Sequence, residues 1–465
     1  MIGHWTLATL AQALRLEPSH LDQDLPITGI STDTRKVAAG NVFVCLRGER
    51  FDAHTFVDQA QAQGAIALVV DHPVASDLPQ FCVPDTLRAL GEIAAFNRQR
   101  FHGPLVAVTG SSGKTTVKEM LARLFSLRGQ TLATQGNLNN AIGAPLTLLR
   151  LSDEDTHAVI ELGASARGEI AYTTAFTQPD VAILNNAYAA HLEGFGSLDG
   201  VAQAKSEIYS TLSPEGWGLV NLDDPYAPFW MEVVRQQGAK LFTFAVQAPA
   251  ADLRVEFLDE DAEGRLLCAL HYHGQRVESC LPLLGRHNLS NLAAAAAAWV
   301  ATGYPLQDLE EGIRACQPVK GRMFPLRTPQ QTRLIDDSYN ANPEAMKAAM
   351  DYLAACSGRR ILVLGDMAEL GEGVEAHHRA MGVYAAEKSI DLLMTTGRWM
   401  QVASEAAQAL GMRAEHYPDI LDLIQALKPL AKAEVTCLVK GSRSAGMERV
   451  VDALMKEEAP ACSCY

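Results

Sequence analysis

The segment Leu105–Thr116, LVAVTGSSGKTT, holds the residue types that bind the phosphates of a nucleotide. Apolar and β-branched residues lead into a loop bracketed by Gly110 and Gly113, and Lys-Thr-Thr then opens a helical pattern. The glycines let backbone amides approach phosphate oxygens, Lys114 can neutralise their charge, and Thr115 can reach a magnesium ion. A valine stands where the first glycine of the strict P-loop belongs, so the loop reads T-G-x-x-G-K-T. An ordinary glycine-rich turn with a chance lysine is the weaker alternative.

Three more polar residues could bind a metal ion or act in catalysis. Glu161 ends the apolar run HAVIE, and a carboxylate there can hold Mg²⁺ directly or through water. His191 lies in the segment AHLEGFG, and Lys205 lies on a predicted helix. Taken singly, each has an ordinary alternative: a surface carboxylate, a structural histidine and a solvated lysine. Further on, Asn288 and Asn291 would share one helix face, suited to an adenine edge or to capping that helix.

The elements that must position these residues alternate between short apolar strands and helices, in three blocks that we place at 1–84, 85–319 and 320–465. This alternation predicts an α/β fold with mostly parallel sheets covered on both faces. Ligands in such sheets bind at the carboxyl ends of the strands. The predicted strands outside the phosphate-binding segment are Ile27–Ser31, Val42–Leu46, Ile66–Val70, Ala158–Glu161, Val181–Asn185, Gly218–Asn221, Thr332–Asp336, Arg360–Leu364, Asp391–Thr395 and Val435–Val439. The predicted helices include His54–Gln63, Leu87–Asn97 and Asn291–Val300, where the alanine run Ala293–Ala298 would pack closely against a sheet.

Composition narrows the class of protein. The chain has 465 residues, too many for one core, and its net charge of -15 argues against nucleic acid or an anionic membrane as the main partner. No apolar run approaches the length of a membrane span, and Met1–Trp5 lacks the pattern of a signal peptide, so we expect a cytoplasmic protein without membrane insertion. The nine cysteines form no Cys-x-x-Cys pair and indicate reduced thiols. Cys462 and Cys464 could bind a metal, but a frayed tail is the favoured interpretation.

Together, these segments resemble the ATP-dependent Mur ligases of peptidoglycan synthesis over nearly the whole chain. The resemblance rests on T-G-x-x-G-K-T, E-L-G-A, A-H-L-E-G-F-G, A-K-x-E-I and G-R-H-N-x-x-N, in that order. Further motifs are similar to the dipeptide-adding members of the family: Ser31–Arg35, Leu46–Glu49, Gly136–Asn140, Ile142–Leu146, Asp336–Pro343, Leu364–Gly371 and Val439–Ser442. Two features depart from the family: Ser206 stands where a glycine is expected, and the tail Ala459–Tyr465 matches nothing.

The resemblance implies three domains with separate substrates. A small α/β N-terminal domain would bind the UDP end of UDP-N-acetylmuramoyl-tripeptide. A central P-loop domain would bind ATP and two Mg²⁺ ions. A C-terminal Rossmann-like α/β domain would close over ATP and bind D-alanyl-D-alanine. We expect a monomer, while the third peptide residue, diaminopimelate or lysine, and the resting domain arrangement stay open.

The resemblance also implies the roles of individual residues. The catalytic residues would be Lys114, Glu161, His191 and Lys205, and the metal ions would be held or supported by Thr115, Glu161, His191 and a carbamylated Lys205. The nucleotide-binding residues would be Gly110, Ser111, Ser112, Gly113, Lys114, Thr115, Thr116, Asn288, Arg322 and Asp337. The residues that contact the other substrates would be Ser31, Arg47, Asn139, Asn140, Arg167, Asn340 and Asn342.

The implied chemistry is amide ligation through an acyl phosphate. The acid substrate attacks the γ-phosphate, the amine then attacks the activated carbonyl, and phosphate leaves from a tetrahedral intermediate. Both steps gather negative charge, so the site needs cations more than a nucleophilic side chain. A bare ammonium on Lys205 would repel a nearby metal ion, by roughly 4 kcal/mol per unit charge at about 4 Å and an effective dielectric near 20. A carbamate would instead offer oxygen ligands; an unmodified lysine on phosphate is the alternative.

Other functions fit parts of the sequence. A sister Mur ligase or a folyl-polyglutamate ligase would add a single amino acid, whereas Asn340–Pro343 and the motifs of the first block favour the dipeptide-adding type. A P-loop kinase would phosphorylate a hydroxyl, and His191 and Lys205 argue against it. A nucleotide-dependent switch would hydrolyse ATP without any amine, whereas a ligase should release phosphate only when both substrates are present.

Overall fold

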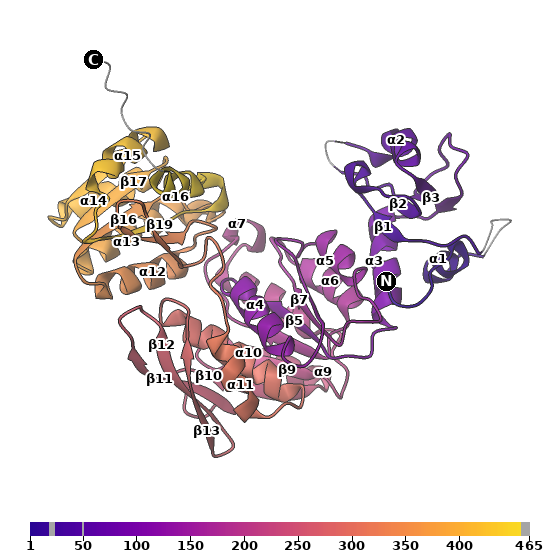
Figure 1. Ribbon diagram of the computed structural model, residues 1–465, viewed down its shortest axis with the longest axis horizontal. Coiled ribbons are helices and arrows are strands. Elements are labelled where there is room, and N and C mark those ends of the chain that lie inside the picture. The colour runs from indigo at the N-terminus through magenta and orange to yellow at the C-terminus, as the bar shows by residue number, and fades with distance from the viewer. Residues whose placement is uncertain (18–23, 49–50, 457–465) are drawn as a thin grey trace.

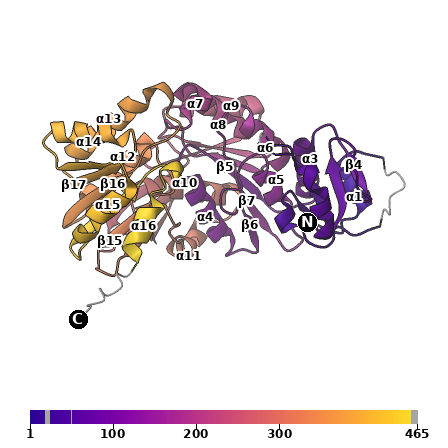
Figure 2. The same cartoon turned by 90° about the horizontal axis from the view of Figure 1, so that it is seen from above.

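The computed structural model describes residues 1–17, 24–48 and 51–456 and contains three sheets, arranged one after another. The N-terminal and C-terminal sheets lie at opposite ends of the central one (Figures 1 and 2). We call each sheet, with the helices that pack on it, the N-terminal, central or C-terminal unit. Most strands are parallel, which confirms the predicted α/β class. Across these described ranges, no helix combines the length and apolar character needed to cross a bilayer. Glu49, Cys462, Cys464 and the tail Ala459–Tyr465 lie outside the described residues.

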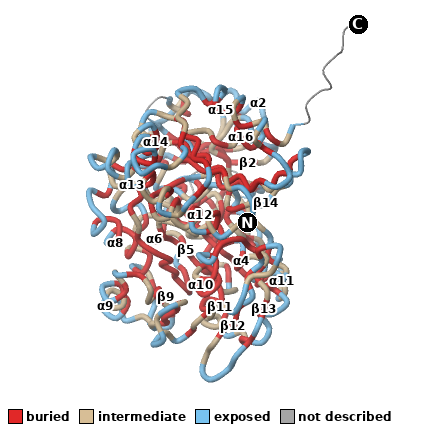
Figure 3. Tube along the Cα trace, turned by 90° about the vertical axis from the view of Figure 1, so that its left-hand side faces the viewer, coloured by how far each residue is buried: buried red, intermediate tan, exposed pale blue. Residues whose placement is uncertain are grey.

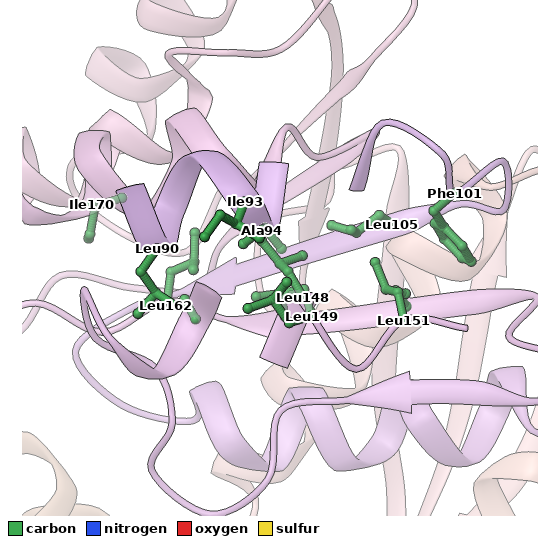
Figure 4. Packing of buried hydrophobic residues seen from close by; sticks show 14 of the residues in the cluster. Leu90, Ile93, Ala94, Phe101, Leu105, Leu148, Leu149, Leu151, Leu162 and Ile170 are labelled. Carbon is green, nitrogen blue, oxygen red and sulfur yellow. The ribbon is translucent and has the colours of Figure 1, made fainter. Parts of the chain in front are cut away.

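The N-terminal sheet has four parallel strands in the order β1-β2-β3-β4. Its elements are α1 (Leu7–Ala13), β1 (Gly29–Ser31), β2 (Asn41–Val44), α2 (Val57–Ala62), β3 (Ala65–Val70), β4 (Gln80–Cys82) and α3 (Thr86–Arg98). Helix α3 leaves this sheet and packs on the central unit, where Leu90, Ile93 and Ala94 share one apolar cluster with Leu148 and Leu162 (Figure 4). The N-terminal and central units are therefore joined by a common core.

The central sheet has nine strands in the order β13-β12-β11-β10-β9-β8-β5-β7-β6. The strands from β6 across to β11 are parallel, and β12 and β13 extend the sheet in antiparallel fashion. Its strands are β5 (Leu105–Thr109), β6 (Thr131–Ala133), β7 (His157–Glu161), β8 (Val181–Leu184), β9 (Trp217–Asn221), β10 (Lys240–Ala245), β11 (Leu253–Glu260), β12 (Leu266–Tyr272) and β13 (Gln275–Leu281). Its helices are α4 (Lys114–Phe125), α5 (Gly143–Leu148), α6 (Glu169–Thr177), α7 (Leu192–Phe195), α8 (Leu198–Ser206), α9 (Ala227–Gln237), α10 (His287–Ala301) and α11 (Leu309–Arg314).

Helices pack on both faces of the central sheet. Its strands β5, β7 and β8 are buried along their whole length, and Figure 3 shows the chain around β5 as buried. Successive side chains of a strand point to opposite faces, so Leu105 and Ala107 of β5 join the cluster that holds α3 and α6. Val106 and Val108 join the other cluster, under α4 and α10. All six alanines of Ala293–Ala298 are buried there, where α10 packs against both the sheet and α4, as the alanine run predicts.

The C-terminal sheet has six strands in the order β14-β15-β19-β16-β17-β18, and only β14 pairs antiparallel. Its elements are β14 (Phe324–Arg327), β15 (Arg333–Asp337), α12 (Pro343–Ala355), β16 (Arg359–Leu364), α13 (Val374–Glu387), β17 (Leu392–Thr396), α14 (Met400–Ala409), β18 (Ala414–Tyr417), α15 (Ile420–Leu427), β19 (Val435–Lys440) and α16 (Glu448–Met455). Helices α12 to α14 pack on one face, and α15 and α16 on the other.

The predicted strands all occur, with ends shifted by at most two residues; Val42–Leu46, for example, is β2, Asn41–Val44. The predicted helix His54–Gln63 is a 3-10 turn, Ala53–Phe56, followed by α2. The helix predicted at Asn291–Val300 begins earlier, at His287. Strands β4, β6, β10 to β14 and β18 were not predicted, because they are only three residues long, half-exposed, or carry polar residues that interrupt an apolar run.

Candidate active site

The loop between β5 and α4 has the backbone of an anion-binding turn. Gly113 has a φ of +81° and stands immediately before Lys114, the first residue of α4. A Cβ at Gly113 would lie 2.2 Å from Asn291 Oδ1 and 2.5 Å from Asn185 Nδ2, so only glycine fits. The free N–H groups of the first turn of α4 therefore begin directly at the loop, where they favour a bound anion.

Asparagines at the ends of β8 and in α10 hold this loop in place. Asn186 accepts the N–H of Ser111 on its backbone oxygen, at 3.1 Å, and the N–H of Ser112 on its Oδ1, at 2.8 Å. Asn185 donates from Nδ2 to the Ser112 carbonyl and to Asn291 Oδ1, both at 3.0 Å. Asn291 in turn donates to Asn288 Oδ1 at 2.8 Å, so the two asparagines do share a helix face. The backbone N–H groups of Ser111 and Ser112, which we predict to bind the nucleotide, thus donate to Asn186 in this structure.

Lys114 folds back over its own loop. Its Nζ donates to the Gly110 carbonyl at 2.7 Å. Burial lowers the pKa of Lys114; nearby Glu161 opposes that shift, and the positive charge of Arg322 adds to it. The Lys114 amine is thus held at the loop and forms no ion pair with a carboxylate among the described residues, which suits it to meet phosphate oxygens.

Glu161, at the end of β7, forms a buried cluster with two neighbouring polar side chains. Thr115 donates from Oγ1 to Glu161 Oε2 at 2.9 Å, and Asn139 donates from Nδ2 to Glu161 Oε1 at 2.8 Å. Arg322, from the C-terminal unit, donates to the same Thr115 Oγ1 at 2.8 Å. The structure thus places the two predicted metal ligands, Thr115 and Glu161, in contact, and the Arg322 guanidinium of the C-terminal unit contacts Thr115.

His191 lies at the start of α7, with a positive φ of 55°. Its Nδ1 faces the carboxylate of Glu369, which belongs to the C-terminal unit and also has a positive φ of 61°. Burial lowers the pKa of His191, with Glu369 acting in the opposite direction. Glu193 N–H also points to the Glu369 carbonyl, at 3.4 Å. Helix α7 is therefore a second place where the central and C-terminal units meet.

Lys205 is buried in α8, with 1 % of its surface exposed. Within the described residues its amine forms no hydrogen bond or ion pair, and its Nζ lies 5.6 Å from the centre of the Phe195 ring. Burial lowers the pKa of Lys205 well below its usual range, and the charge of Lys114 adds to the shift. Ser206, the residue that departs from the family, ends α8 and bonds the Gln203 carbonyl at 2.7 Å, so the helix accommodates it.

The C-terminal unit contributes a buried ion pair at the ends of β15 and β19. Lys440 donates from Nζ to Asp337 Oδ2 at 2.6 Å, and Asp337 Oδ1 accepts the N–H of Met323 at 3.1 Å. The guanidinium of Arg322 lies 4.4 Å from the centre of the Tyr339 ring, which orients it toward the central unit. The sequence motif Val439–Ser442 contains Lys440 but assigns it no role. Lys440 ends β19, which pairs with β15 beside Asp337, and that position at a strand end is the sequence signal for this ion pair.

One cavity of about 880 Å³ lies between the central and C-terminal units. That volume is within the range of small-molecule sites. The predicted site residues that line it are Ser111, Ser112, Gly113, Lys114, Thr116, Asn139, Asn140, Glu161, His191, Asn288, Arg322, Asp337, Asn340 and Asn342. Among these, Asn342 crosses between the units, because its Nδ2 donates to Ser112 Oγ at 2.9 Å. The cavity also includes Tyr188, Asp224 and Glu344, which sequence reasoning missed because no motif marks them.

Other predicted site residues lie outside the cavity wall. Gly110 and Thr115 are adjacent to it through the contacts already described. The contact described for Lys205 is with Phe195, which does not line the cavity, and Arg167 is an exposed residue in the loop after β7. Ser31 and Arg47 belong to the N-terminal sheet. Ser31 donates to the Asp33 carbonyl at 3.1 Å, and Arg47 pairs with two aspartates at 3.2 Å each. The structure therefore does not bring these two residues to the nucleotide-sized cavity.

Family models match three segments of the chain. They are described as Mur ligase family, catalytic domain, over residues 26–98, Mur ligase middle domain, over 108–299, and Mur ligase, glutamate ligase domain, over 321–443. Curated relatives named UDP-N-acetylmuramoyl-tripeptide–D-alanyl-D-alanine ligase match along most of the chain. The one from Escherichia coli (strain K12) is 46% identical over 435 residues, covering 93% of this chain and 95% of the relative. The one from Bacillus subtilis (strain 168) is 33% identical, covering 92% and 93%.

Solved structures of related proteins also match along most of the chain. MurF from Acinetobacter baumannii superposes with a TM-score of 0.89 at 34% identity, covering 98% of this chain and 100% of that one. MurF from Thermotoga maritima, in complex with ADP, has a TM-score of 0.81 at 27% identity, covering 92% and 97%. With the family models and relatives matching over all three units, this chain belongs to the Mur ligase family.

Proposed function

We propose that this protein joins D-alanyl-D-alanine to UDP-N-acetylmuramoyl-tripeptide, with ATP converted to ADP and phosphate. The observation that carries the proposal is the cavity between the central and C-terminal units, where Lys114, Glu161 and Arg322 converge. The 46% identical relative bears the name of this activity, and the cationic cavity fits its chemistry. The reaction would supply a cell-wall precursor in the cytoplasm, with the protein acting as a monomer.

We infer that each of the three units binds a different substrate. We assign the UDP end of the acid substrate to residues 1–84, where Ser31 and Arg47 lie, and ATP to residues 85–319. The C-terminal unit, residues 320–465, would close over ATP with Arg322 and Asp337 and admit the dipeptide. Asn139, Asn140 and Arg167 would contact the peptide of the acid substrate, and Asn340 and Asn342 the amine side. This arrangement would bring the reacting groups together at the contact between the central and C-terminal units.

The chain's own residues explain how such a site would lower the reaction barrier. When the acid carboxylate attacks the γ-phosphate, two anions approach each other, and Lys114 and Arg322 would offset their repulsion. The same cations would stabilise the charge that gathers on the tetrahedral intermediate before phosphate leaves. Because Arg322 comes from the C-terminal unit, full stabilisation requires the two units to be in contact, which also excludes water.

The cluster around Glu161 suits a magnesium ion. Thr115 Oγ1 and Glu161 Oε2 lie 2.9 Å apart. These two oxygens would together hold the ion. Such an ion would neutralise phosphate charge. Both groups are oxygen donors, the kind of ligand that magnesium prefers.

We further propose that Lys205 acts as a carbamate near a second magnesium ion, together with His191. The neutral amine would attack carbon dioxide, form an N–C bond and release one proton, which leaves a carbamate with a negative charge. Three observations support this: the amine is buried, it has no partner among the residues described, and its pKa is lowered well below the usual range by burial. A neutral amine is the reactive form, and the product would offer oxygens to a metal ion.

A single reaction series tests the ligase proposal. The purified protein is incubated with ATP, Mg²⁺, D-alanyl-D-alanine and either UDP-N-acetylmuramoyl-tripeptide, with diaminopimelate or lysine as its third residue. We expect a product heavier by one dipeptide minus water, and phosphate release only when both substrates are present. Omission of each component in turn serves as the control.

The alternatives give different products in the same series. A sister Mur ligase or a folyl-polyglutamate ligase would accept a single amino acid and leave the dipeptide unused. A kinase would yield a phosphorylated substrate without an amide, and a nucleotide switch would release phosphate without any amine. Any of these results would contradict the proposed function.

A further inference from the structure

Helix α6 begins without a cap of its own. Its N-cap residue is Gly168, which has a φ of 84° and no side chain to accept a hydrogen bond. The first N–H groups of a helix have no partner within the helix, and they stabilise a negative charge placed near them. The start of α6 therefore depends on an acceptor from elsewhere in the chain.

Glu207 supplies that acceptor from the turn that follows α8. Its carboxylate accepts the N–H of Gly168 at 2.8 Å on Oε1 and 3.1 Å on Oε2, and the N–H of Ala171 at 3.0 Å on Oε2. Hydrogen bonds from N–H groups to a carboxylate are stronger than those between neutral groups. Glu207 thus fixes the beginning of α6 against the end of α8.

The loop that leads into α6 carries Arg167, and it runs from β7 past the cavity. Its residues Gly163, Ala164 and Ser165 line the cavity. The carbonyl of Ser165 is so close to α7 that a Cβ on Gly194 would lie 1.9 Å from it. The loop is therefore enclosed by α7 on one side, while Glu207 fixes its far end.

Glu207 follows Lys205 by only two residues, so it ties this loop to the segment that carries the buried lysine. We propose that Glu207 is a positioning residue: it holds the Arg167 loop where Arg167 meets the peptide of the acid substrate. Because this role presupposes the proposed function, its test separates the two. Glu207 itself would touch neither substrate nor nucleotide.

The test compares full-length Glu207→Ala and Glu207→Gln with the matched control Asp419→Ala. Asp419 is another carboxylate cap, accepting the N–H of Leu421 at 2.7 Å at the start of α15, in the C-terminal unit and outside the cavity wall. Calorimetry measures the Kd of UDP-N-acetylmuramoyl-tripeptide and of UDP-N-acetylmuramic acid, which lacks the peptide. Amide exchange at Gly168 and Ala171 reports directly on the loop.

We expect Glu207→Ala to raise the Kd for the tripeptide substrate about tenfold and to change the Kd for the peptide-free compound less than twofold. Exchange at Gly168 and Ala171 should accelerate. Glu207→Gln keeps one acceptor oxygen and should stay within about threefold of the wild type, and Asp419→Ala should bind both compounds normally.

Equal weakening for both UDP compounds, or normal tripeptide binding by Glu207→Ala, would overturn the positioning role while leaving the ligase proposal intact. Failure of the wild type to bind the tripeptide compound and to form the amide product would overturn both.

Discussion

At the scale of single residues, two buried lysines of the central unit differ in what surrounds their amines. Lys118 and Lys205 are each 1 % exposed. Lys118 donates from Nζ to the Thr134 carbonyl at 2.8 Å and pairs with Glu119 at 2.5 Å. Lys205 has no such partner among the described residues, and a buried charge without a partner destabilises the folded state. Although the two lysines are equally buried, Lys118 is compensated by its partners, whereas a charge on Lys205 lowers the stability of the folded state.

We expect Lys205→Met to raise the free energy of unfolding at pH 7 by about 1 kcal/mol or more in buffer free of carbon dioxide. The folded-state pKa of Lys205 is lowered, so the unfolded chain binds more protons between that pKa and the usual one near 10.5. Wild-type stability then rises with pH across this window, and the advantage of the variant shrinks. Lys118→Met should instead lose stability, because the Thr134 carbonyl is left without a donor. Chemical denaturation from pH 6 to 10 measures the free energy of unfolding of both variants. Equal losses of stability in Lys205→Met and Lys118→Met would show that the Lys205 amine has a partner.

The carbamate that we propose on Lys205 predicts how a Lys205→Ala variant can be rescued. Ligase activity should fall nearly to zero, because the proposed oxygen ligand would be lost. Acetate should restore part of it by placing a carboxylate in the vacant space, and small amines should not. Steady-state rates across a concentration series of each compound measure the effect. Rescue by amines alone would mean that an unmodified ammonium binds phosphate.

Lys114→Ala tests where the phosphates bind. We expect turnover to be abolished, because this cation lies at the phosphate loop, while thermal unfolding without nucleotide stays near wild type. Within the described part of the chain the side chain forms one hydrogen bond, to the Gly110 carbonyl at 2.7 Å, so little folding energy is lost. A ligand stabilises the folded state more when it binds more tightly, so the rise in unfolding temperature on adding ATP should shrink. Substantial ligase activity in this variant would show that the phosphates lie elsewhere.

At the scale of elements, two glycines at helix ends share a left-handed backbone but differ in their surroundings. Gly113, before α4, has a φ of 81°, and Gly238, after α9, has a φ of 77°. A side chain at Gly238 would meet nothing within 4 Å, whereas one at Gly113 would collide with Asn291 and Asn185. We expect Gly238→Ala to cost about 1 kcal/mol from backbone strain alone. Gly113→Ala should cost more and also abolish ATP binding, as denaturation and calorimetry would show. Similar losses at both sites would mean that the asparagines move aside freely.

Strands and helices could be predicted from the sequence where a single signal, such as a continuous apolar run, marked them. Strands such as β7 and β16 are apolar runs buried on both faces, so composition alone marks them. In contrast, β13 alternates exposed and buried residues at the edge of the central sheet, and β14 is a half-exposed antiparallel strand. The predicted helix at Asn291 began late because the first turn, from His287, carries polar residues that face the loop and not the core.

At the scale of the whole molecule, the site consists of pairs that are far apart in sequence. Arg322 meets Thr115, Asn342 meets Ser112, and Glu369 meets His191. The sequence identified one or both members of each pair by motif, but not the pairing, because that depends on the angle between units. Glu369 illustrates the limit: its motif was recognised, yet its contact with α7 exists only because the C-terminal unit lies against the central one.

Arg322→Ala tests whether contact between the units contributes to the reaction. Arg322 donates to Thr115 Oγ1 at 2.8 Å from a unit that does not carry the phosphate loop. An interaction completed only when the units close lowers the barrier and not the ground state. We therefore expect kcat to fall about 10²- to 10³-fold, the usual cost of removing one charge-stabilising donor, while the Kd for ATP changes only a few-fold.

A control for this prediction lies in the same interface. Arg333 also crosses between the two units, donating to the Glu263 carbonyl at 3.3 Å and to Tyr352 at 2.6 Å within its own unit, away from the cavity wall. Arg333→Ala should leave kcat within about twofold of the wild type, because it removes a contact between units but no charge near phosphate. Single-turnover rates and equilibrium ATP binding separate the two quantities. Equal losses of ATP affinity and turnover in Arg322→Ala would favour a site that is already assembled before the units close.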